Sequence, residues 1–236
     1  MSKLSFEDQR RAALMAKTDS IRYQETVLAK DVPPIRFSVK DDLFVPCVEP
    51  KHPFYREQHE TFDLDKYMYP RMPIELGNSE LSFDQITESV NVLRTPIKFP
   101  GTDYLIPQEL KVFFPLIRRV AEYEAGINQR HNDCCVHITV DKSTVKEGET
   151  HRYPGFHGDG VQGAKFSQKS YLPIEHSYIL TSSPPTEFCI QPFFFRHLND
   201  AKHNIFHEME LQVRECNIYK TLPWHLYLID PYMVHR

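Results

Sequence analysis

His157 and Asp159 are separated only by Gly158, and a further histidine, His235, lies near the end of the sequence. Alternate residues of a β-strand face the same side, so the imidazole and the carboxylate are expected to point together, with the glycine turned away. Neighbours on one strand cannot surround a metal ion by themselves, so a third ligand has to come from a distant strand. His235 meets this need because it ends an apolar run that is typical of a strand.

Two imidazoles and one carboxylate form a ligand set that suits Fe(II) and occupies one face of an octahedral ion. The opposite face then stays open for a co-substrate and dioxygen. Gly155, Gly158 and Gly160 remove side-chain bulk around the motif, which lets backbone and ligands approach closely. The pattern therefore predicts a non-haem iron site.

The elements that must position these ligands are predicted to be short strands. After residue 132 the chain has the alternation and the β-branched and aromatic content of strands over 135–140, 178–181, 188–191, 225–229 and 232–235. The last two are expected to form one strand with an irregularity at Pro231. A helical insertion is expected over 198–213, with Asn199 as its N-cap. Short strands separated by turn signals indicate a sandwich or a barrel.

The first half of the chain is predicted to be helical and proline-rich. A helix is expected over residues 5–29, and a second, short one is expected to begin within 82–85. Residues 107–128 carry apolar side chains at spacings of three and four, and Pro115 should kink or split that helix near Phe114. Prolines and aromatic residues between 32 and 73 favour extended segments that wrap a core built elsewhere.

Composition limits the classes of partner. The 236 residues have a formal net charge of -4, so no overall basic field gathers phosphates, and we expect a small-molecule substrate and no nucleic acid. Five cysteines, an odd number without CxxC spacing, favour a reducing cytoplasm. No apolar run approaches the roughly 20 residues of a membrane span, and the charged N-terminus does not resemble a signal peptide. No membrane association is expected, and no oligomeric state is indicated.

Three stretches resemble the Fe(II)- and 2-oxoglutarate-dependent oxygenases of the double-stranded β-helix fold. They are Phe-His-Gly-Asp-Gly at 156–160, Ser-Pro-Pro-Thr-Glu-Phe at 183–188, and Leu-Ile-Asp-Pro-Tyr-Met-Val-His-Arg at 228–236. The first is similar to the HxD motif of the family, the second to the turn before a Thr-x-Phe strand, and the third to the strand of the distal histidine. The resemblance covers roughly residues 134–236.

The resemblance implies a fold of mainly β class with flanking helices (α+β), a double-stranded β-helix, or jelly roll, buttressed by N-terminal helices. A single domain over 1–236 is expected. Residues 1–130 would form a helical and proline-rich wrapping region, and residues 131–236 a jelly-roll catalytic core that is truncated if the natural chain continues past Arg236.

The activity implied is that of a dioxygenase that uses Fe(II), 2-oxoglutarate and O2. The co-substrate is decarboxylated to succinate and CO2, and an unactivated C–H bond of a small or medium-sized organic substrate is hydroxylated. Halogenating relatives lack the carboxylate ligand, so Asp159 argues against halogenation. Desaturation, ring formation and demethylation stay open, as does the identity of the substrate.

The residue that anchors the far carboxylate of 2-oxoglutarate departs from the common family pattern. Many relatives use an arginine roughly ten residues beyond the distal histidine, whereas this chain ends at Arg236. Some use a lysine ten to fifteen residues after the aspartate, and Lys169 fits that window, with Lys165 second. Other candidate cations and hydroxyl groups are Arg152, Arg196, Arg236, Tyr171, Tyr178 and Thr186.

Other candidate ligand groups are expected to be structural. His203 and His207 would share one face of a helix, but the general base of the HExxH motif is missing there. Strand alternation places Cys135 and His137 on one face and Cys134 on the other, which favours ordinary thiols of a buried strand. The motif at 157–159 also has a bland interpretation, because Gly-Asp-Gly is common in tight surface turns.

Two other functions stay open at this point. A cupin-like hydrolase or isomerase that depends on another metal, such as zinc, would use a similar ligand set without oxygen. A binding protein on the same fold, with decayed catalytic residues, would hold no metal.

Overall fold

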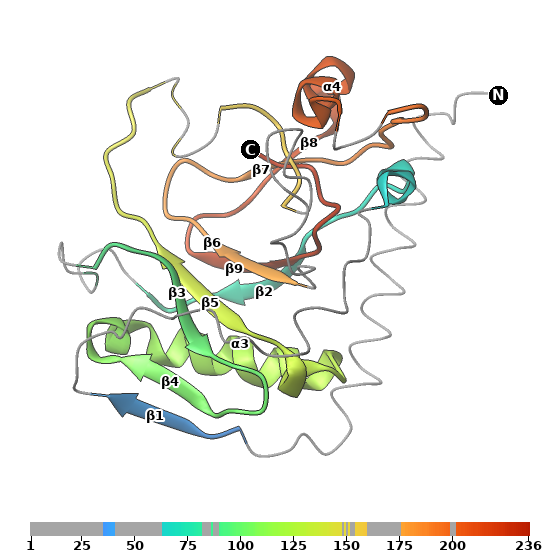
Figure 1. Cartoon of the computed structure of the whole chain (residues 1–236). Coiled ribbons are helices and arrows are strands. Elements are labelled where there is room, and N and C mark those ends of the chain that lie inside the picture. Colours follow the sequence, from blue (N-terminus) through green and yellow to red (C-terminus); the bar gives the residue numbers. More distant parts are fainter. Residues whose placement is uncertain are drawn as a thin grey trace. The chain divides into compact units, whose positions relative to one another are not determined.

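The computed structural model describes residues 35–40, 63–81, 86, 90–147, 149, 151, 154–159, 176–198 and 202–236 (Figure 1). The chain divides into two compact units, which we treat separately. Unit 1 takes its described residues from the ranges 51–80 and 145–236, and unit 2 from 19–50 and 81–144. Both units combine helices with small sheets, antiparallel except for one parallel strand pair in unit 2, which is an α+β architecture.

Unit 2 contains two pairs of strands and the longest described helix. β1 (Phe37–Lys40) pairs in parallel with β4 (Tyr104–Pro107), and β3 (Val92–Lys98) pairs antiparallel with β5 (Val136–Val140) with two register shifts. The helical elements are η3 (Gln108–Phe113), α3 (Phe114–Ile127) and η4 (His131–Asp133). The buried core of the unit consists of Val90, Ile97, Tyr104, Ile106, Leu110, Phe113, Ile117 and Ala121.

The predicted division of the 107–128 helix near Phe114 is confirmed. Pro115 lies in the first turn of α3, where its missing N–H costs no helical hydrogen bond. Inside a longer α-helix the same proline would remove a hydrogen bond and clash with the preceding turn, so the residues before it form the 3-10 helix η3 instead. Ile117 and Ala121, four positions apart, are both buried, as the predicted apolar face requires.

The described residues of unit 1 form two small sheets. In the first, β9 (His225–Ile229) lies between β2 (Ile74–Asn78) and β6 (Ser177–Leu180), and all pairs are antiparallel. In the second, β7 (Glu187–Cys189) pairs with β8 (Ile218–Lys220). Single bridges then join residue 235 to residue 188 on one side and to residue 157 on the other. The segment that ends the chain therefore lies between β7 and the predicted metal motif.

Helical elements of unit 1 are η1 (Leu64–Met68), α4 (Ile205–Gln212) and η6 (Glu215–Asn217). The predicted N-cap of the insertion helix, Asn199, lies outside the described residues. The described helix α4 begins only at Ile205, and the side chain of Asn204 caps it by accepting from the backbone N–H of His207. None of the described helices is long and apolar enough to cross a membrane.

Four predicted strands occur within one or two residues of their predicted bounds, as β5, β6, β7 and β9. The expected strand over 232–235 is reduced to the bridge at His235. The reason is a turn: the side chain of Asp230 accepts from the backbone of Tyr232 at 2.7 Å, and its carbonyl accepts from Met233 at 3.2 Å. The predicted helices over 5–29 and 82–85 lie outside the described residues.

The predicted domain organisation stays a prediction. Residues 136–140 were expected to open the jelly-roll core, and they pair instead with β3 in unit 2. The predicted metal motif, the segment at His235 that is bridged to it, and β7 on the other side of that segment all belong to unit 1.

Candidate metal centre

The side chains of His157, Asp159 and His235 converge in unit 1. Their candidate ligand atoms all lie within 4.8 Å of one another, and the two imidazole ring centres are 4.6 Å apart. Nε2 of His235 lies 3.8 Å from Oδ1 of Asp159, which is longer than a hydrogen bond. Two ligands of one ion with bonds of about 2.0–2.2 Å are roughly 3 to 4 Å apart, and the 3.8 Å between His235 and Asp159 lies in that range.

Antiparallel pairing brings the two histidines together. The backbone N–H of His157 donates to the carbonyl of His235 at 2.9 Å, and the N–H of His235 donates back at 2.8 Å. Residues directly opposite each other in such a pair carry their side chains on the same face. His235, which is distant in sequence, is thus placed beside His157 by direct backbone pairing, as predicted for the third ligand. Asp159 follows Gly158 in a turn rather than in a strand.

Both imidazoles are oriented by the same device. Nδ1 of His157 lies 3.3 Å from the carbonyl of Gly155, and Nδ1 of His235 lies 3.0 Å from the carbonyl of Met233. A carbonyl oxygen can only accept, so each Nδ1 is the protonated nitrogen. In a neutral imidazole the lone pair then belongs to Nε2, which is the nitrogen that would bind a metal.

The site is buried on one side and reachable on the other. The His235 side chain is 8% exposed, whereas the Asp159 side chain is 29% exposed. His157 is half-buried, and the ring of Phe206 from α4 meets it edge-on with centres 5.8 Å apart. An ion held here would therefore keep a face toward incoming ligands at the side of the carboxylate.

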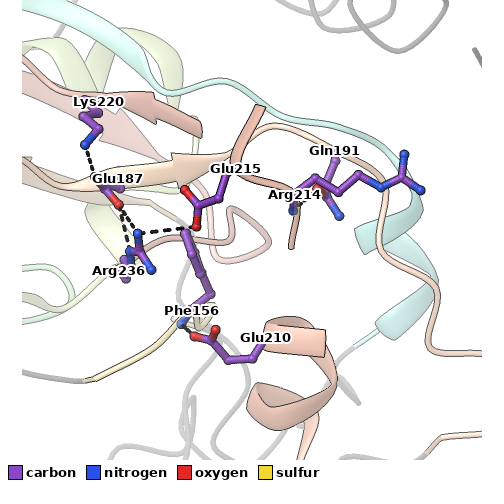
Figure 2. Close-up of polar contacts among 8 residues, drawn as sticks. All are labelled: Phe156, Glu187, Gln191, Glu210, Arg214, Glu215, Lys220 and Arg236. Atoms are coloured by element: carbon purple, nitrogen blue, oxygen red, sulfur yellow. Dashed lines mark hydrogen bonds and ion pairs between the residues drawn. The ribbon is translucent and has the colours of Figure 1, made fainter. Parts of the chain in front are cut away.

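A cluster of ion pairs holds the residue that follows His235 (Figure 2). Arg236 donates to Glu187 through Nε at 2.7 Å and Nη2 at 2.6 Å, and Lys220 contacts the other oxygen of the same carboxylate at 2.5 Å. Partial burial alone would raise the pKa of Glu187, but these hydrogen bonds outweigh it and lower the pKa. The guanidinium also lies 4.5 Å above the ring of Phe156.

Helix α4 holds the segment that precedes His157. The Glu210 carboxylate accepts a hydrogen bond from the backbone N–H of Phe156 (Figure 2). Gly155 has φ of +92°, and a Cβ there would come within 2.5 Å of Glu210 Oε1. Glycine is thus favoured at 155 by its backbone conformation, because Glu210 Oε1 is the end of a flexible side chain that can move aside.

Four of the eight residues predicted as candidates to hold 2-oxoglutarate lie outside the described residues, namely Lys169, Lys165, Tyr171 and Arg152. Thr186 is described and buried, just before β7, where its N–H donates to Thr221 Oγ1 at 3.0 Å. Arg236 is engaged by Glu187, and Arg196 is exposed. The anchoring role of each remains a prediction.

No second metal-like cluster of histidine, cysteine and carboxylate occurs among the described residues. The predicted pair of histidines does not share a helix face, because His203 precedes α4 and only His207 lies within it. In unit 2, Cys134 Sγ lies 3.3 Å from the carbonyl of Arg130. The described part of the chain therefore concentrates metal-binding groups at one place.

Sequence reasoning missed Tyr67, Glu187 and Glu210, which support the site from outside it. Tyr67 lies in η1, far from the motif in sequence, and its hydroxyl donates to the carbonyl of Pro231 at 3.3 Å. Burial raises its pKa well above the usual value, and the charges of Tyr232, Asp230 and Asp159 add to the increase. No local pattern marks such residues, because their partners come from distant segments.

The candidate metal centre is thus defined by three side chains and the backbone contacts that hold them. Comparisons with models of known families, with curated proteins and with solved structures find no match for this chain.

Proposed function

We propose that this chain is a non-haem Fe(II)- and 2-oxoglutarate-dependent oxygenase that hydroxylates an unactivated C–H bond of a small or medium-sized organic substrate. The observation that carries the proposal is the convergence of His157, Asp159 and His235, with Nδ1 of both imidazoles donating to backbone carbonyls. Two imidazoles and one carboxylate form the ligand set of non-haem Fe(II) oxygenases.

The residues present fit such an ion. His157 and His235 would supply neutral nitrogen ligands, and Asp159 would supply an anionic oxygen that offsets part of the metal charge. When bound, the iron would bring 2-oxoglutarate and dioxygen together; dioxygen would be the oxidant, with one oxygen atom passing to succinate as CO2 is released and the other to the C–H bond of the substrate. The protein's own part is to hold the ligands: backbone carbonyls fix both ring orientations, and Phe206 shields one side of His157.

The path of the chain through the two sheets of unit 1 supports the jelly-roll part of the proposal. β6 lies in the first sheet, β7 and β8 in the second, β9 in the first, and His235 bridges to β7 of the second. The chain thus passes from the first sheet to the second, back to the first and again to the second, which is similar to the crossing between sheets in a double-stranded β-helix, although β7 and β8 follow one another within one sheet. The predicted ligands lie on neighbouring segments of one sheet, 157 beside 235.

The decisive experiment is anaerobic titration of the full chain with Mn(II) or Fe(II), followed by 2-oxoglutarate, in a calorimeter. A saturable isotherm for each is expected, and succinate formation should need Fe(II) and oxygen. Asp159→Ala should abolish both metal binding and succinate formation, whereas Asp103→Ala, at an exposed carboxylate of unit 2, should leave them unchanged. Full turnover by the Asp159 variant would refute the proposal.

The same set of measurements distinguishes the two rival functions. The two-nitrogen, one-oxygen ligand set also suits catalytic zinc, so a hydrolase or isomerase would retain Zn(II) tightly on purification and act without oxygen. A binding protein with decayed residues would take up no metal after anaerobic reconstitution. Either result would replace the oxygenase proposal.

For the co-substrate, Lys169 remains the proposed anchor of the far carboxylate, with Arg152, Tyr171 and Thr186 as further contacts. Lys169→Ala should weaken 2-oxoglutarate binding by about tenfold or more while leaving Mn(II) binding intact. Unchanged affinity for 2-oxoglutarate would reject Lys169. The reducing cytoplasmic setting, proposed from the cysteine pattern, suits Fe(II).

A further inference from the structure

We propose that the Tyr67 hydroxyl positions the metal-ligand turn, by filling the space above Gly158 and tying that turn to the segment that carries His235. Tyr67 is a positioning residue in this proposal and touches no metal. The inference rests on the proposed metal centre, and the experiment below separates its failure from the failure of that centre.

The Tyr67 ring is held firmly before it reaches the site. It is 1% exposed and packs edge-on against Phe195 and Tyr232, with ring centres 5.4 Å and 5.3 Å away. Its carbonyl accepts from the N–H of Phe193 at 2.9 Å. The side chain of Asp63 caps η1 by accepting from Asp65 N at 3.0 Å. The packing of the ring and the anchoring of η1 therefore fix the position of the Tyr67 hydroxyl.

That place is the space next to Gly158. A Cβ built on Gly158 would overlap the Tyr67 hydroxyl and would lie 3.1 Å from its Cζ and 3.2 Å from the carbonyl of Pro231. The hydroxyl donates to the same Pro231 carbonyl at 3.3 Å. One phenol thus contacts the residue between His157 and Asp159 and also the turn that leads to His235.

Space, rather than backbone conformation, requires glycine at 158. The described glycines with positive φ are Gly77, Gly101 and Gly155, and Gly158 is not among them. An alanine there would have an allowed backbone and would be excluded only by its contacts. Gly155 differs, because its φ of +92° penalises any side chain whatever lies nearby.

The segment that contains Tyr67 also holds the second turn by its charges. Arg71 pairs with the carboxylate of Asp230, and the guanidinium of Arg71 lies 5.4 Å from the ring centre of Tyr232. The Asp230 side chain in turn accepts from Tyr232 N. Residues 63–71 therefore act as a brace between the two ligand-bearing segments, and Tyr67 is the part of the brace that reaches Gly158.

The test compares the wild-type chain with Tyr67→Phe, Gly158→Ala and the double variant Tyr67→Phe/Gly158→Ala. The readouts are the dissociation constant for Mn(II) under anaerobic conditions and the midpoint of thermal unfolding. Loss of the hydroxyl should weaken Mn(II) binding about tenfold, and the added methyl about 100-fold. In the Tyr67→Phe background the methyl should cost less than about tenfold, because the overlapping oxygen is gone.

Three control variants make the result specific. Tyr104→Phe makes the same chemical change at a buried tyrosine of unit 2 and should leave Mn(II) affinity unchanged. Gly155→Ala should lower the unfolding midpoint, and adding Tyr67→Phe should not relieve that loss, since its cause is the backbone at 155. If Gly158→Ala does not fold, recovery of folding in the double variant supports the proposal.

Two outcomes overturn the proposal in different ways. If the wild-type chain binds Mn(II) and Tyr67→Phe binds it equally well, or if the effects of Tyr67→Phe and Gly158→Ala simply multiply, Tyr67 does not position the turn and the metal centre stands. If the wild-type chain binds no Mn(II), the proposed metal centre fails and the inference fails with it.

Discussion

Unit 1 and unit 2 both bury polar side chains, but they use them in opposite ways. In unit 2 the ammonium of Lys98, 2% exposed, lies among the carbonyl oxygens of Phe99, His131, Asn132 and Cys134 at 3.1–3.3 Å. In unit 1 two imidazoles and a carboxylate, all groups that offer electron pairs, face one another. Hydrogen-bond donors that are paired with acceptors need no further partner. Three groups that all offer electron pairs are instead a suitable ligand set for a cation.

The free-energy cost of burial explains why this contrast is informative. A buried charge is tolerated when hydrogen bonds replace its lost hydration, and Lys98 obtains that replacement entirely from backbone carbonyls. Burial still lowers the pKa of Lys98, with nearby thiols and Asp133 opposing that shift. The three side chains of the cluster in unit 1 all offer electron pairs, and they form the ligand set on which the proposed metal site rests.

The largest effect should come from removing a ligand in unit 1. His235→Ala is expected to weaken Mn(II) binding by at least about 100-fold, because an ion then keeps only two protein ligands. Calorimetric titration measures the loss. His207→Ala, at an exposed histidine of α4 outside the cluster, should bind Mn(II) like the wild-type chain. Equal binding by the His235 variant would break the contrast between the units, because the gathered groups would then not be a metal site.

The convergence of His157, Asp159 and His235 could be predicted because its signals are local. The His-Gly-Asp spacing and an apolar run that ends in histidine each carry their own pattern, and antiparallel pairing of residues 157 and 235 brings them together, although Asp159 lies in a turn rather than in the expected strand. The split of the 107–128 helix was equally local, since Pro115 alone decides it.

The supporting contacts could not be predicted because they join segments with no common pattern. Nothing near Tyr67 in the sequence refers to Gly158, and a lysine such as Lys98 is normally solvated. β2 and β3 were missed because a bulge interrupts the pairing of β2 near Gly77, and Pro96 and the positive φ of Arg94 interrupt β3. Long-range packing, rather than periodicity, stabilises these elements.

The next largest effect concerns stability in unit 2. Lys98→Met keeps much of the side-chain volume but removes the donor, so buried carbonyl oxygens lose their partner, and the free energy of unfolding should fall by about 2–4 kcal/mol. Urea unfolding followed by circular dichroism measures it. Lys111→Met, at an exposed lysine of η3, should change stability by less than about 0.5 kcal/mol.

The Lys98 prediction sharpens the comparison through its second readout. Mn(II) affinity of Lys98→Met should stay within about twofold of the wild-type value, because the ammonium serves the backbone of unit 2 alone. A stability loss no larger than that of Lys111→Met would show that the carbonyl cluster does not need its donor, and the structural role assigned to Lys98 would be wrong.

The smallest effect is a dependence of stability on pH from His131 in unit 2. This histidine is 7% exposed, stacks on Tyr104 and has no hydrogen-bond partner at Nδ1 among the described residues. Burial lowers its pKa, the charge of Lys98 lowers it further, and Glu124 opposes the shift. His131 therefore binds a proton less readily in the folded state than in the unfolded state.

The sign of the pH effect follows from that difference. Above the ordinary histidine pKa of about 6.5, His131 is neutral in both the folded and the unfolded chain and has no effect on the pH dependence of stability. As the pH falls below that value, the unfolded chain gains a proton first, so the free energy of unfolding decreases. The decrease ends once the pH has passed the lowered pKa of the folded state. His131→Phe should remove this loss between pH 7.5 and 5.0 in urea titrations, and at pH 7.5 it should be neutral or stabilising by up to about 1 kcal/mol, since an unpaired buried nitrogen disappears. His207→Phe, at an exposed position, should keep the wild-type slope. If the His131→Phe chain loses as much stability on acidification as the wild-type chain, the acid-sensitive group lies elsewhere. Burial of the charged form of His131 would then cost no measurable free energy, in contrast to the cost that the backbone carbonyls offset for Lys98.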